Sequence, residues 1–332
     1  MINLRFSLRL PEGNRTASEQ AVARSALFGA AVDMVAWGED RGCVAATLSE
    51  HHSSPDGYLP SPLVLAAAIA SRTQTIPIVI AALLGLLYDP VRLAEDLSVL
   101  DHLSRGRVFP VFGMGYRDEE YAMFGVDSTT RGAQMEALLV FLRQAWSGQP
   151  VEYPGRGMVQ ITPLPFTPGG PPLGYGGHSV AAARRAARHG LMFLAEAGGE
   201  HLRDAYEDEA RRLGIEPAGC QLSPADSATT VFVAEDPDAA WHELGPVMLH
   251  EIRIYREWNR AAGKSGIASI SGADSVEELR SEGRGYRIYT PSEAAALAGQ
   301  GAVLTLEPLC GGLAPERAWA YLETAVSALA PQ

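Results

Sequence analysis

Cysteine is scarce in this chain, which has three among its 332 residues. Cys43, Cys220 and Cys310 are odd in number, lie far apart, and show none of the paired spacings of zinc sites or redox motifs. A disulfide-stabilised scaffold is therefore excluded, because such frameworks need several cysteine pairs. A reducing cytoplasm is the simplest setting for the chain.

Long hydrophobic runs and an excess of positive charge are also missing. The longest apolar runs, Pro62 to Ala70 and Ile76 to Leu87, are too short to span a bilayer, and the first residues contain no apolar segment of signal-peptide length. Lysine and arginine number 27 against 39 aspartate and glutamate, so the formal net charge is -12. A nucleic-acid surface needs a concentrated basic face, so we expect no binding of nucleic acid. The short apolar runs and the few cysteines lead us to expect a cytoplasmic protein that does not bind a membrane.

The composition is otherwise that of an ordinary globular protein, with 47% hydrophobic and 20% charged residues. Apolar strand patterns alternate with helical patterns, and eight such pairs favour an α/β fold with a single closed (β/α)₈ TIM barrel over an open sheet. No linker separates two cores, so we expect one domain over residues 1–332. The predicted strands are Ile2–Leu10, Val44–Leu48, Ile76–Leu84, Val108–Phe112, Pro172–Tyr175, Leu191–Ala195, Thr229–Val233 and Gly301–Leu306.

Two segments interrupt this alternation, after the fourth and seventh pairs. The first, residues 148–172, contains many proline and glycine residues and is predicted to form a small hairpin. The second, residues 261–287, is rich in glycine and serine and is mostly polar, which is typical of a mobile loop or lid.

The stretch from Asp89 to Asp127 predicts where the chemistry lies. A helix beginning after Pro90 is followed by the turn Ser104-Arg105-Gly106, the apolar strand Val108–Phe112 and the glycine loop Gly113-Met114-Gly115. A strand buried on both faces belongs to a parallel sheet, and such folds place their chemistry just past the C-terminal ends of the strands. The apolar face of the helix is predicted to consist of Leu93, Leu97, Leu100 and Leu103.

The first candidate site is Glu50-His51-His52, which directly follows the strand Val44–Leu48. Either histidine can be a hydrogen-bonded structural residue, but the C-terminal ends of barrel strands line the barrel mouth. Adjacent histidines on a strand point to opposite sides, and no further ligand pattern completes a metal site. We therefore expect no metal here.

The second candidate is Gly176-Gly177-His178-Ser179, at the start of a helix. Exposed backbone N–H groups, the helix dipole and the serine hydroxyl together favour an anion, most naturally a phosphate; the alternative is a plain turn with Ser179 as N-cap. Arg131 could add a fixed positive charge or lie on the surface. We expect Arg184, Arg185 and Arg188 to be solvated helix positions.

The third candidate is the pair Ala81-Ala82, at the end of an apolar strand. Small side chains at a strand end let a planar ligand approach the backbone closely. Plain core packing explains the pair equally well from the residues alone.

In combination, the chain resembles the bacterial-luciferase-like flavin-dependent monooxygenases, from the first strand to the final helix. Several short motifs in one order are more specific than any one of them. The motifs that carry the resemblance are Glu50-His51-His52, Pro90-Val91-Arg92-Leu93-Ala94-Glu95-Asp96, Leu100-Asp101, Ser104-Arg105-Gly106-Arg107, Phe124-Gly125, Gly177-His178-Ser179 and Ala186-Ala187-Arg188-His189-Gly190.

This resemblance implies a barrel that holds reduced FMN in its mouth. Oxygen would add to the flavin, and the resulting C4a-peroxyflavin would oxidise a small apolar organic substrate. His51 matches the first histidine of the family's Glu-His-His and is implied as the catalytic acid/base. A separate flavin reductase is the expected partner, because no nicotinamide fingerprint GxGxxG is present.

The resemblance also implies the cofactor-binding residues. Ala81-Ala82 matches a strand-end pair that lies against the isoalloxazine ring and is joined in the family by a non-proline cis peptide. Arg131 and Ser179 match phosphate-binding positions, and residues 261–287 correspond roughly to a lid that closes over flavin. The other implied cofactor contacts are Glu50, Met114, Tyr116, Gly177 and His178.

Three departures separate the chain from true luciferases. Their reactive cysteine falls near Phe112, a phosphate-binding arginine falls near Gly113 or Met114, and an acidic residue beside the phosphate-site serine is His178 here. Light emission is therefore not expected, and His178 is a candidate to compensate for the absent arginine.

Several alternatives stay open. An oxidoreductase of the same fold could use the deazaflavin F420 for hydride transfer, although Glu50-His51-His52 favours FMN. A non-catalytic flavin-binding partner subunit and a metal-dependent hydrolase are the other readings. By resemblance we expect a dimer, with a homodimer as the first expectation and a heterodimer left open. We also expect an apolar pocket that includes Phe112, Met114 and Tyr116.

Overall fold

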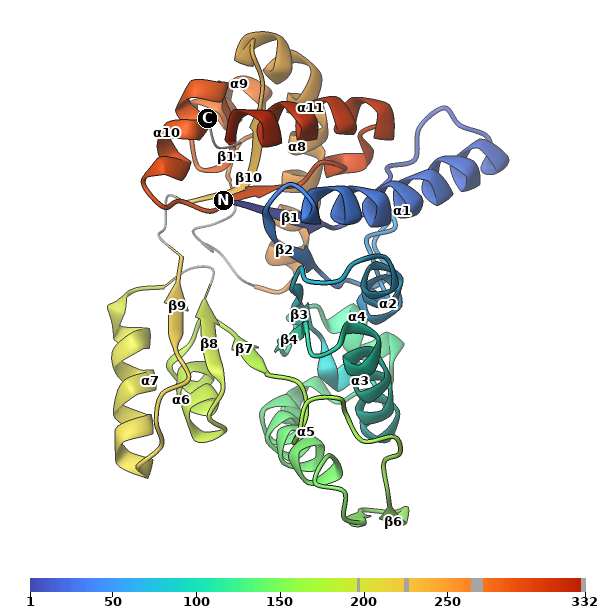
Figure 1. Cartoon of the computed structure of the whole chain (residues 1–332), viewed down its shortest axis with the longest axis vertical. Coiled ribbons are helices and arrows are strands. Elements are labelled where there is room, and N and C mark those ends of the chain that lie inside the picture. The colour runs from blue at the N-terminus through green and yellow to red at the C-terminus, as the bar shows by residue number, and fades with distance from the viewer. Residues whose placement is uncertain (196–197, 224–226, 264–270, 330–332) are drawn as a thin grey trace. The chain divides into compact units, whose positions relative to one another are not determined.

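The computed structural model describes residues 1–195, 198–223, 227–263 and 271–329, and its elements are shown in Figure 1. The chain divides into two compact units. Unit 1 consists of Met1–Pro60 and Ala225–Gln332, and unit 2 consists of Ser61–Pro224. Each unit contains its own run of parallel strands, so the predicted α/β class is confirmed in both. Whether the chain is one domain stays a prediction.

Unit 1 contains five parallel strands in the order β11-β10-β12-β1-β2. The helices α1 and α11 run alongside each other (Figure 1), joined by an edge-to-face contact of Trp37 and Trp319 with ring centroids 5.5 Å apart. The elements of unit 1 are β1 Ile2–Phe6, α1 Ala17–Glu39, β2 Cys43–Leu48, β10 Ala228–Val233, α8 Pro237–Ala261, α9 Val276–Glu282, β11 Gly285–Tyr289, α10 Pro291–Gly299, β12 Leu304–Leu306, the 3₁₀ turn η3 Cys310–Gly312 and α11 Pro315–Leu329.

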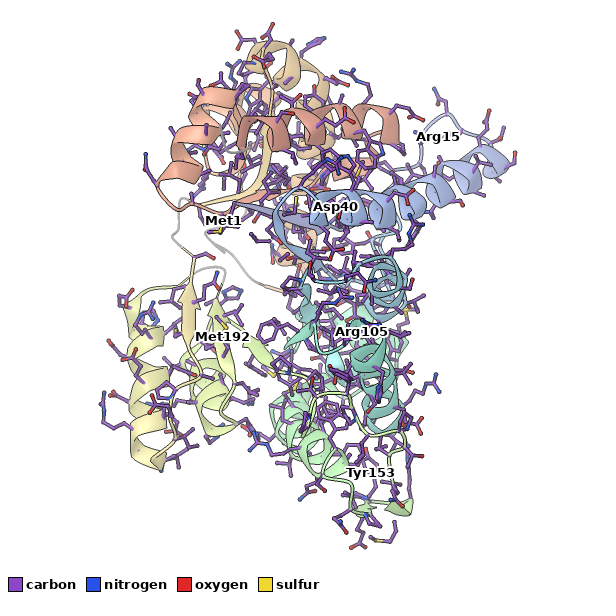
Figure 2. All side chains as sticks on the ribbon, viewed as in Figure 1. Met1, Arg15, Asp40, Arg105, Tyr153 and Met192 are labelled. Carbon is purple, nitrogen blue, oxygen red and sulfur yellow. The ribbon has the colours of Figure 1, made fainter. Side chains whose placement is uncertain are left out.

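Unit 2 contains five parallel strands in the order β3-β4-β7-β8-β9, and a separate antiparallel hairpin of β5 and β6. The predicted hairpin excursion is thus confirmed. Tyr153 of β5, labelled in Figure 2, packs on Phe141 of α5 with ring centroids 4.9 Å apart. The elements of unit 2 are α2 Pro62–Arg72, β3 Ile78–Leu83, η1 Gly85–Leu87, α3 Pro90–Ser104, β4 Val108–Phe112, α4 Asp118–Met123, η2 Ser128–Thr130, α5 Arg131–Ala145, β5 Val151–Tyr153, β6 Gly157–Val159, β7 Gly174–Gly176, α6 Val180–Arg188, β8 Met192–Ala195, α7 Glu200–Leu213 and β9 Cys220–Leu222.

All eight predicted strands are present, and two further parallel strands, β9 and β11, were not predicted. Strand β11 and helix α9 lie in the segment expected to be a lid, so the interpretation of its second half as a loop is wrong. Ser275 caps α9 by accepting a hydrogen bond from the backbone N–H of Glu278, and Tyr286 and Ile288 are buried on β11. Residues 264–270 of that segment lie outside the described residues.

The first strand is shorter than predicted, because β1 ends at Phe6 and not at Leu10. Leu8 has φ of 53°, a left-handed conformation that no strand residue adopts. The chain therefore turns just past β1, and Ser7 and Arg9 are both buried there.

Helix α3 buries Leu93, Leu97 and Leu100 as predicted, but Leu103 is 47% exposed. Ten residues at 100° each leave Leu103 about 80° away from Leu93 around the helix. Asp101 and Ser104 occupy the inward positions instead. The Asp101 carboxylate accepts a hydrogen bond from the backbone N–H of Thr167 at 2.6 Å, which holds the hairpin excursion on α3.

The turn Ser104-Arg105-Gly106-Arg107 ends α3 and hydrogen-bonds the C-terminal end of α2. Arg105 ends α3 in a left-handed conformation with φ of 54°. The Arg107 guanidinium donates hydrogen bonds to four backbone carbonyls, from the ends of α2 and α3 and from the segment before β3. These are the carbonyls of Ala70 at 3.1 Å, Thr73 at 3.0 Å, Ile76 at 2.8 Å and Ser104 at 2.7 Å.

None of the helices within the described residues is both long and apolar enough to cross a membrane.

Replacing Arg107 by methionine is expected to destabilise the protein by about 2–4 kcal/mol, because four carbonyls lose a charged donor. Urea unfolding followed by circular dichroism measures the change. Arg184→Met is the matched control, since Arg184 is exposed on α6 and its loss should change stability by less than about 0.5 kcal/mol. Equal stability of the two variants would show that the Arg107 contacts do not stabilise the turn.

Candidate functional site

In unit 2, small residues occupy the C-terminal ends of β3 and β4. The Ala81–Ala82 peptide bond is cis, as the family resemblance implied, and both alanines are half-buried. The backbone N–H of Gly113 donates to the carbonyl of Leu83 at 2.9 Å. A Cβ added at Gly113 would lie 2.6 Å from the Cβ of Ala82, so glycine is required for this close approach.

The loop after β4 carries two more of the predicted cofactor residues, Met114 and Tyr116, which are both half-buried. The Tyr121 hydroxyl donates to the carbonyl of Met114, which ties the loop to α4. Phe112 was expected to line the pocket, and this is wrong. Its side chain is fully buried, and a Cβ at Gly85 would lie 2.6 Å from its ring.

The predicted phosphate residues lie at the starts of two helices. Ser179 caps α6, accepting a hydrogen bond from the backbone N–H of Ala182 at 3.2 Å. His178 and Ser179 are exposed, and Gly177 is tied to β8 through its N–H and the carbonyl of Leu194 at 3.1 Å. Arg131 is the first residue of α5. Both helix N-termini favour an anion.

Arg185, in the second turn of α6, links that helix to the first turn of α5, and its predicted solvated position is wrong. Its side chain is buried, and its guanidinium donates to the Tyr175 hydroxyl at 3.0 Å and to Glu136 at 3.0 Å. Its Nη2 also lies 3.5 Å from the carbonyl of Gly132, the neighbour of Arg131. The first turn of α5 therefore lies beside α6. Arg184 is exposed as expected.

In unit 1, Glu50, His51 and His52 follow the C-terminal end of β2. Glu50 and His52 are buried and face each other, with Oε1 and Nε2 3.1 Å apart. The two histidines have different partners, since His52 contacts Glu50 and His51 contacts aromatic rings. His51 is half-buried among three aromatic rings, whose centroids lie 4.9 Å (Tyr58), 4.7 Å (Trp258) and 6.0 Å (Tyr255) from its own.

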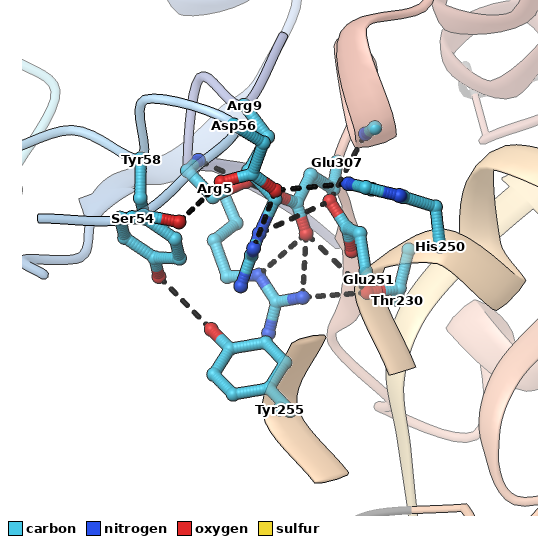
Figure 3. Close-up of polar contacts among 12 residues, drawn as sticks. Arg5, Arg9, Ser54, Asp56, Tyr58, Thr230, His250, Glu251, Tyr255 and Glu307 are labelled. Carbon is cyan, nitrogen blue, oxygen red and sulfur yellow. Dashed lines mark hydrogen bonds and ion pairs between the residues drawn. The ribbon is translucent and has the colours of Figure 1, made fainter. Parts of the chain in front are cut away.

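Arg9 lies against the same rings and was not predicted. Figure 3 shows its guanidinium between the turn after β2 and helix α8. Its Cζ lies 4.5 Å from the ring centroid of Tyr58, 4.7 Å from Tyr255 and 5.2 Å from Trp258. Its side chain is 0% exposed, and its Nη1 donates to Asp56 Oδ2 at 2.7 Å. A buried cation is thus stabilised by one carboxylate and by ring faces.

Asp56 has two further partners, the Ser54 hydroxyl, which donates to it, and the His250 ring, whose Nε2 lies 3.1 Å away. Burial alone would raise the pKa of Asp56, but His250, Arg9 and Ser54 together hold that pKa well below its usual range. Asp56 therefore stays ionised wherever the protein is folded near neutral pH.

A second ion pair, between the partly exposed Arg5 and the buried Glu307, continues this cluster toward β12 (Figure 3). Arg5 donates to Glu307 through Nε at 3.0 Å and Nη2 at 2.5 Å. Burial opposes ionisation of Glu307, but Arg5 and the Ser7 hydroxyl lower its pKa. Burial, and next the Glu307 carboxylate, raise the pKa of Glu251. Of the two buried carboxyls, Glu251 therefore takes up a proton first.

Sequence reasoning missed Arg9, Asp56, Tyr255 and Trp258. Asp56 stands in a turn-rich segment and the two aromatic residues stand in a helix, where a solvated turn or ordinary packing explains them. Asp56 and Arg9 are 47 positions apart, and Tyr255 is 197 positions from Tyr58, which accepts its hydroxyl hydrogen bond at 3.1 Å. No local pattern indicates such contacts.

Within the described ranges, no three histidine, cysteine, aspartate or glutamate side chains gather as a metal site requires.

Comparison with known proteins supplies a family context for this geometry. The family model described as luciferase-like monooxygenase matches residues 4–300. The alkanal monooxygenase alpha chain of Photorhabdus luminescens is 28% identical over 160 residues, which cover 47% of this chain and 44% of that protein. The chain thus matches less than half the length of this curated relative.

Solved structures resemble the whole chain in fold. The oxygenating constituent of 3,6-diketocamphane monooxygenase of Pseudomonas putida, in complex with FMN, has a TM-score of 0.70 at 18% identity and covers 100% of this chain and 98% of its own. An F420-dependent secondary alcohol dehydrogenase in complex with an F420-acetone adduct has a TM-score of 0.66 at 15% identity, with coverages of 99% and 98%. These likenesses confirm the predicted barrel class of the fold.

The Asp56→Asn variant is expected to lose about 2–4 kcal/mol of stability at neutral pH, since it weakens a buried ion pair. Because folding lowers the pKa of Asp56, its stabilisation is fully present above the unfolded carboxyl pKa of about 4 and is lost as pH falls through the lower folded value. The difference between wild type and variant should therefore be constant above about pH 5 and shrink below about pH 4. Denaturant unfolding at several pH values measures it. A difference that grows on acidification contradicts this assignment.

Proposed function

The chain belongs to the luciferase-like monooxygenase family, and from this premise we propose that it is an FMN-dependent monooxygenase that oxidises a small apolar organic substrate with O₂. One observation in unit 2 carries the proposal. Small residues at the end of β3 and directly after β4 stand in the same unit as the starts of α5 and α6, which favour an anion, and Arg185 of α6 reaches the first turn of α5. A cofactor with a planar ring and one terminal phosphate would fit this combination of features.

The residues of unit 2 fit the two ends of such a cofactor. Ala81 and Ala82 offer no side chain beyond Cβ, so a ring system can lie against the strand ends. The exposed Ser179 and His178 and the cation of Arg131 offer the donors and the positive field that a phosphate needs, and Gly177, whose N–H is bonded to Leu194, is assigned as a backbone contact without a side chain. We assign Met114, Tyr116 and Glu50 as further cofactor contacts.

When bound, reduced flavin supplies the electrons that activate oxygen. We assign the catalytic role to His51. It acts as the acid/base that gives or takes a proton at a nitrogen of its imidazole ring. Its surroundings support this role, because Tyr58, Tyr255 and Trp258 cover the imidazole and limit access of water to it. Apolar surroundings also favour an apolar substrate.

Reduced FMN would come from a separate reductase, because the sequence has no GxGxxG nicotinamide fingerprint. We propose a homodimer, following the family resemblance.

A second candidate is hydride transfer with F420. It is supported by the F420-dependent alcohol dehydrogenase, whose fold covers this chain as fully as that of the FMN-bound oxygenase. A third candidate is a flavin-binding subunit without activity of its own. The ring-enclosed His51 argues for the catalytic reading.

The function is tested by anaerobic titration with reduced FMN and with F420, followed by stopped-flow mixing of the reduced-FMN complex with oxygen. We expect reduced FMN to bind and F420 not to bind. We expect His51→Ala to change the rate constant of flavin oxidation by on the order of 10²-fold. Tight binding of F420 alone would replace FMN by F420. An unchanged rate constant in His51→Ala would favour the subunit without catalysis.

The phosphate assignment is tested by comparing FMN with riboflavin, which has no phosphate. Arg131→Met is expected to raise the Kd of reduced FMN by about 10- to 100-fold, because one charge-assisted hydrogen bond is worth roughly 1.5–3 kcal/mol. The Kd of reduced riboflavin should stay the same. Arg184→Met, on the exposed face of α6, is the control for general charge effects. Equal loss of both flavins in Arg131→Met would remove Arg131 from the phosphate site.

A further inference from the structure

The contacts of Arg9 are unusual for a buried arginine. Its side chain is completely buried, yet its one hydrogen-bonding nitrogen is Nη1, which donates to Asp56 at 2.7 Å. Within the described residues, Nε and Nη2 have no hydrogen-bond partner. The guanidinium instead packs against the faces of Tyr58, Tyr255 and Trp258. One hydrogen-bonded carboxylate and three rings therefore hold its position, and a second carboxylate, that of Glu251, lies 3.9 Å away.

These three rings are also the ones that surround His51. Tyr58 and Trp258 lie closest to the imidazole, with centroid distances of 4.9 Å and 4.7 Å. The rings come from two distant segments, because Tyr58 follows β2 while Tyr255 and Trp258 belong to α8. Arg9 comes from a third segment, just past β1. A displacement of the guanidinium would therefore move the walls that hold the imidazole.

We propose that Arg9 is a positioning residue for His51. Its planar cation stacks on Tyr58, Tyr255 and Trp258 together, which fixes the distance between the loop after β2 and helix α8. His51 then occupies the space that these rings leave. The inference rests on the proposed function only where it concerns the catalytic role of His51.

The chemistry of arginine suits this task. A guanidinium is flat and can face several rings at once, whereas a lysine ammonium is a compact, strongly hydrated point charge. Burial raises the pKa of Tyr58 and of Tyr255, so both phenols are neutral and their ring faces attract the cation. The Tyr255 hydroxyl donates to that of Tyr58 at 3.1 Å and joins the two rings further.

Two carboxylates lie near Arg9, those of Asp56 and Glu251, and Asp56 determines which position the guanidinium takes. The Nε of Arg9 lies 3.9 Å from Oε1 of Glu251, too far for a hydrogen bond but close enough to attract the cation. Asp56 is the stronger partner because it is ionised, while burial raises the pKa of Glu251. Weakening Asp56 should let Arg9 shift toward Glu251 and away from the rings.

The test compares Arg9→Lys with Arg5→Lys in the whole protein without flavin. Arg5 is the matched control. It is a second arginine from the same strand region, it pairs with Glu307, and among the described residues its guanidinium lies over none of the three rings that Arg9 contacts. The probe is the ¹³C-labelled imidazole signal of His51, assigned by its absence in His51→Ala. Its chemical shift depends on the surrounding rings. We expect Arg9→Lys to move this signal and Arg5→Lys to leave it in place.

The same variants are then examined with reduced FMN and oxygen. Arg9→Lys is expected to change the rate constant of flavin oxidation by on the order of 10-fold, in the direction of His51→Ala, because small displacements of a reacting group have effects of this size. The Kd of reduced FMN should be unchanged. If wild type fails to bind reduced flavin, the proposed function fails, and the His51 signal still decides the role of Arg9.

Asp56→Asn is the second variant, in case Arg9→Lys does not fold. It keeps the shape of the side chain and removes the charge, so the His51 signal should move in this variant too. A folded Arg9→Lys or a folded Asp56→Asn whose His51 signal stays at the wild-type position would overturn the proposal, and so would an equal displacement in Arg5→Lys.

Discussion

A charge buried in a protein must be paired, and this requirement shapes the C-terminal ends of the strands in unit 1. Arg9 and Asp56 are both fully buried, and each would be strongly destabilising without the other. The pair brings the segment after β1 against the turn after β2, and His250 extends it to α8. Since His51 lies among the rings that cover this pair, the ion pair supports the candidate acid/base.

Unit 2 presents a different surface at its strand ends. There Ala82 and Gly113 bring two strands close together without any charged side chain, and the polar groups are supplied by the starts of α5 and α6. Backbone N–H groups and exposed side chains at helix starts can bind an anion reversibly, because they are hydrated when no ligand is present. The strand ends of unit 1 thus carry buried charges paired among aromatic rings, and those of unit 2 carry small residues beside two helix starts.

The motifs that led to the family divide between structural and site roles once their contacts are known. Arg107 closes the ends of two helices, and Asp101 holds the hairpin excursion, so both are structural. Glu50 is buried against His52. His51, the neighbour of both, is the member of that motif with ring contacts suited to chemistry. Sequence reasoning located the motifs without separating these roles, since a motif records which residues are required and not which neighbours they have.

The sequence by itself determined the alternation of strands and helices, the hairpin excursion, the caps at Ser179 and the cis-linked alanine pair inferred by resemblance. The alanine pair rests on the family resemblance, and the other features depend on periodicity and on neighbours a few residues away. Sequence reasoning failed for β11, whose short alternation adjoins a glycine-rich segment. It also failed for Arg185, whose contacts with Tyr175 and Glu136 no local pattern indicates. Only the tertiary structure decided that the Arg9 guanidinium packs against the ring faces of Tyr255 and Trp258. These contacts join residues about 200 to 250 positions apart, and such contacts have no signature in any local stretch of sequence.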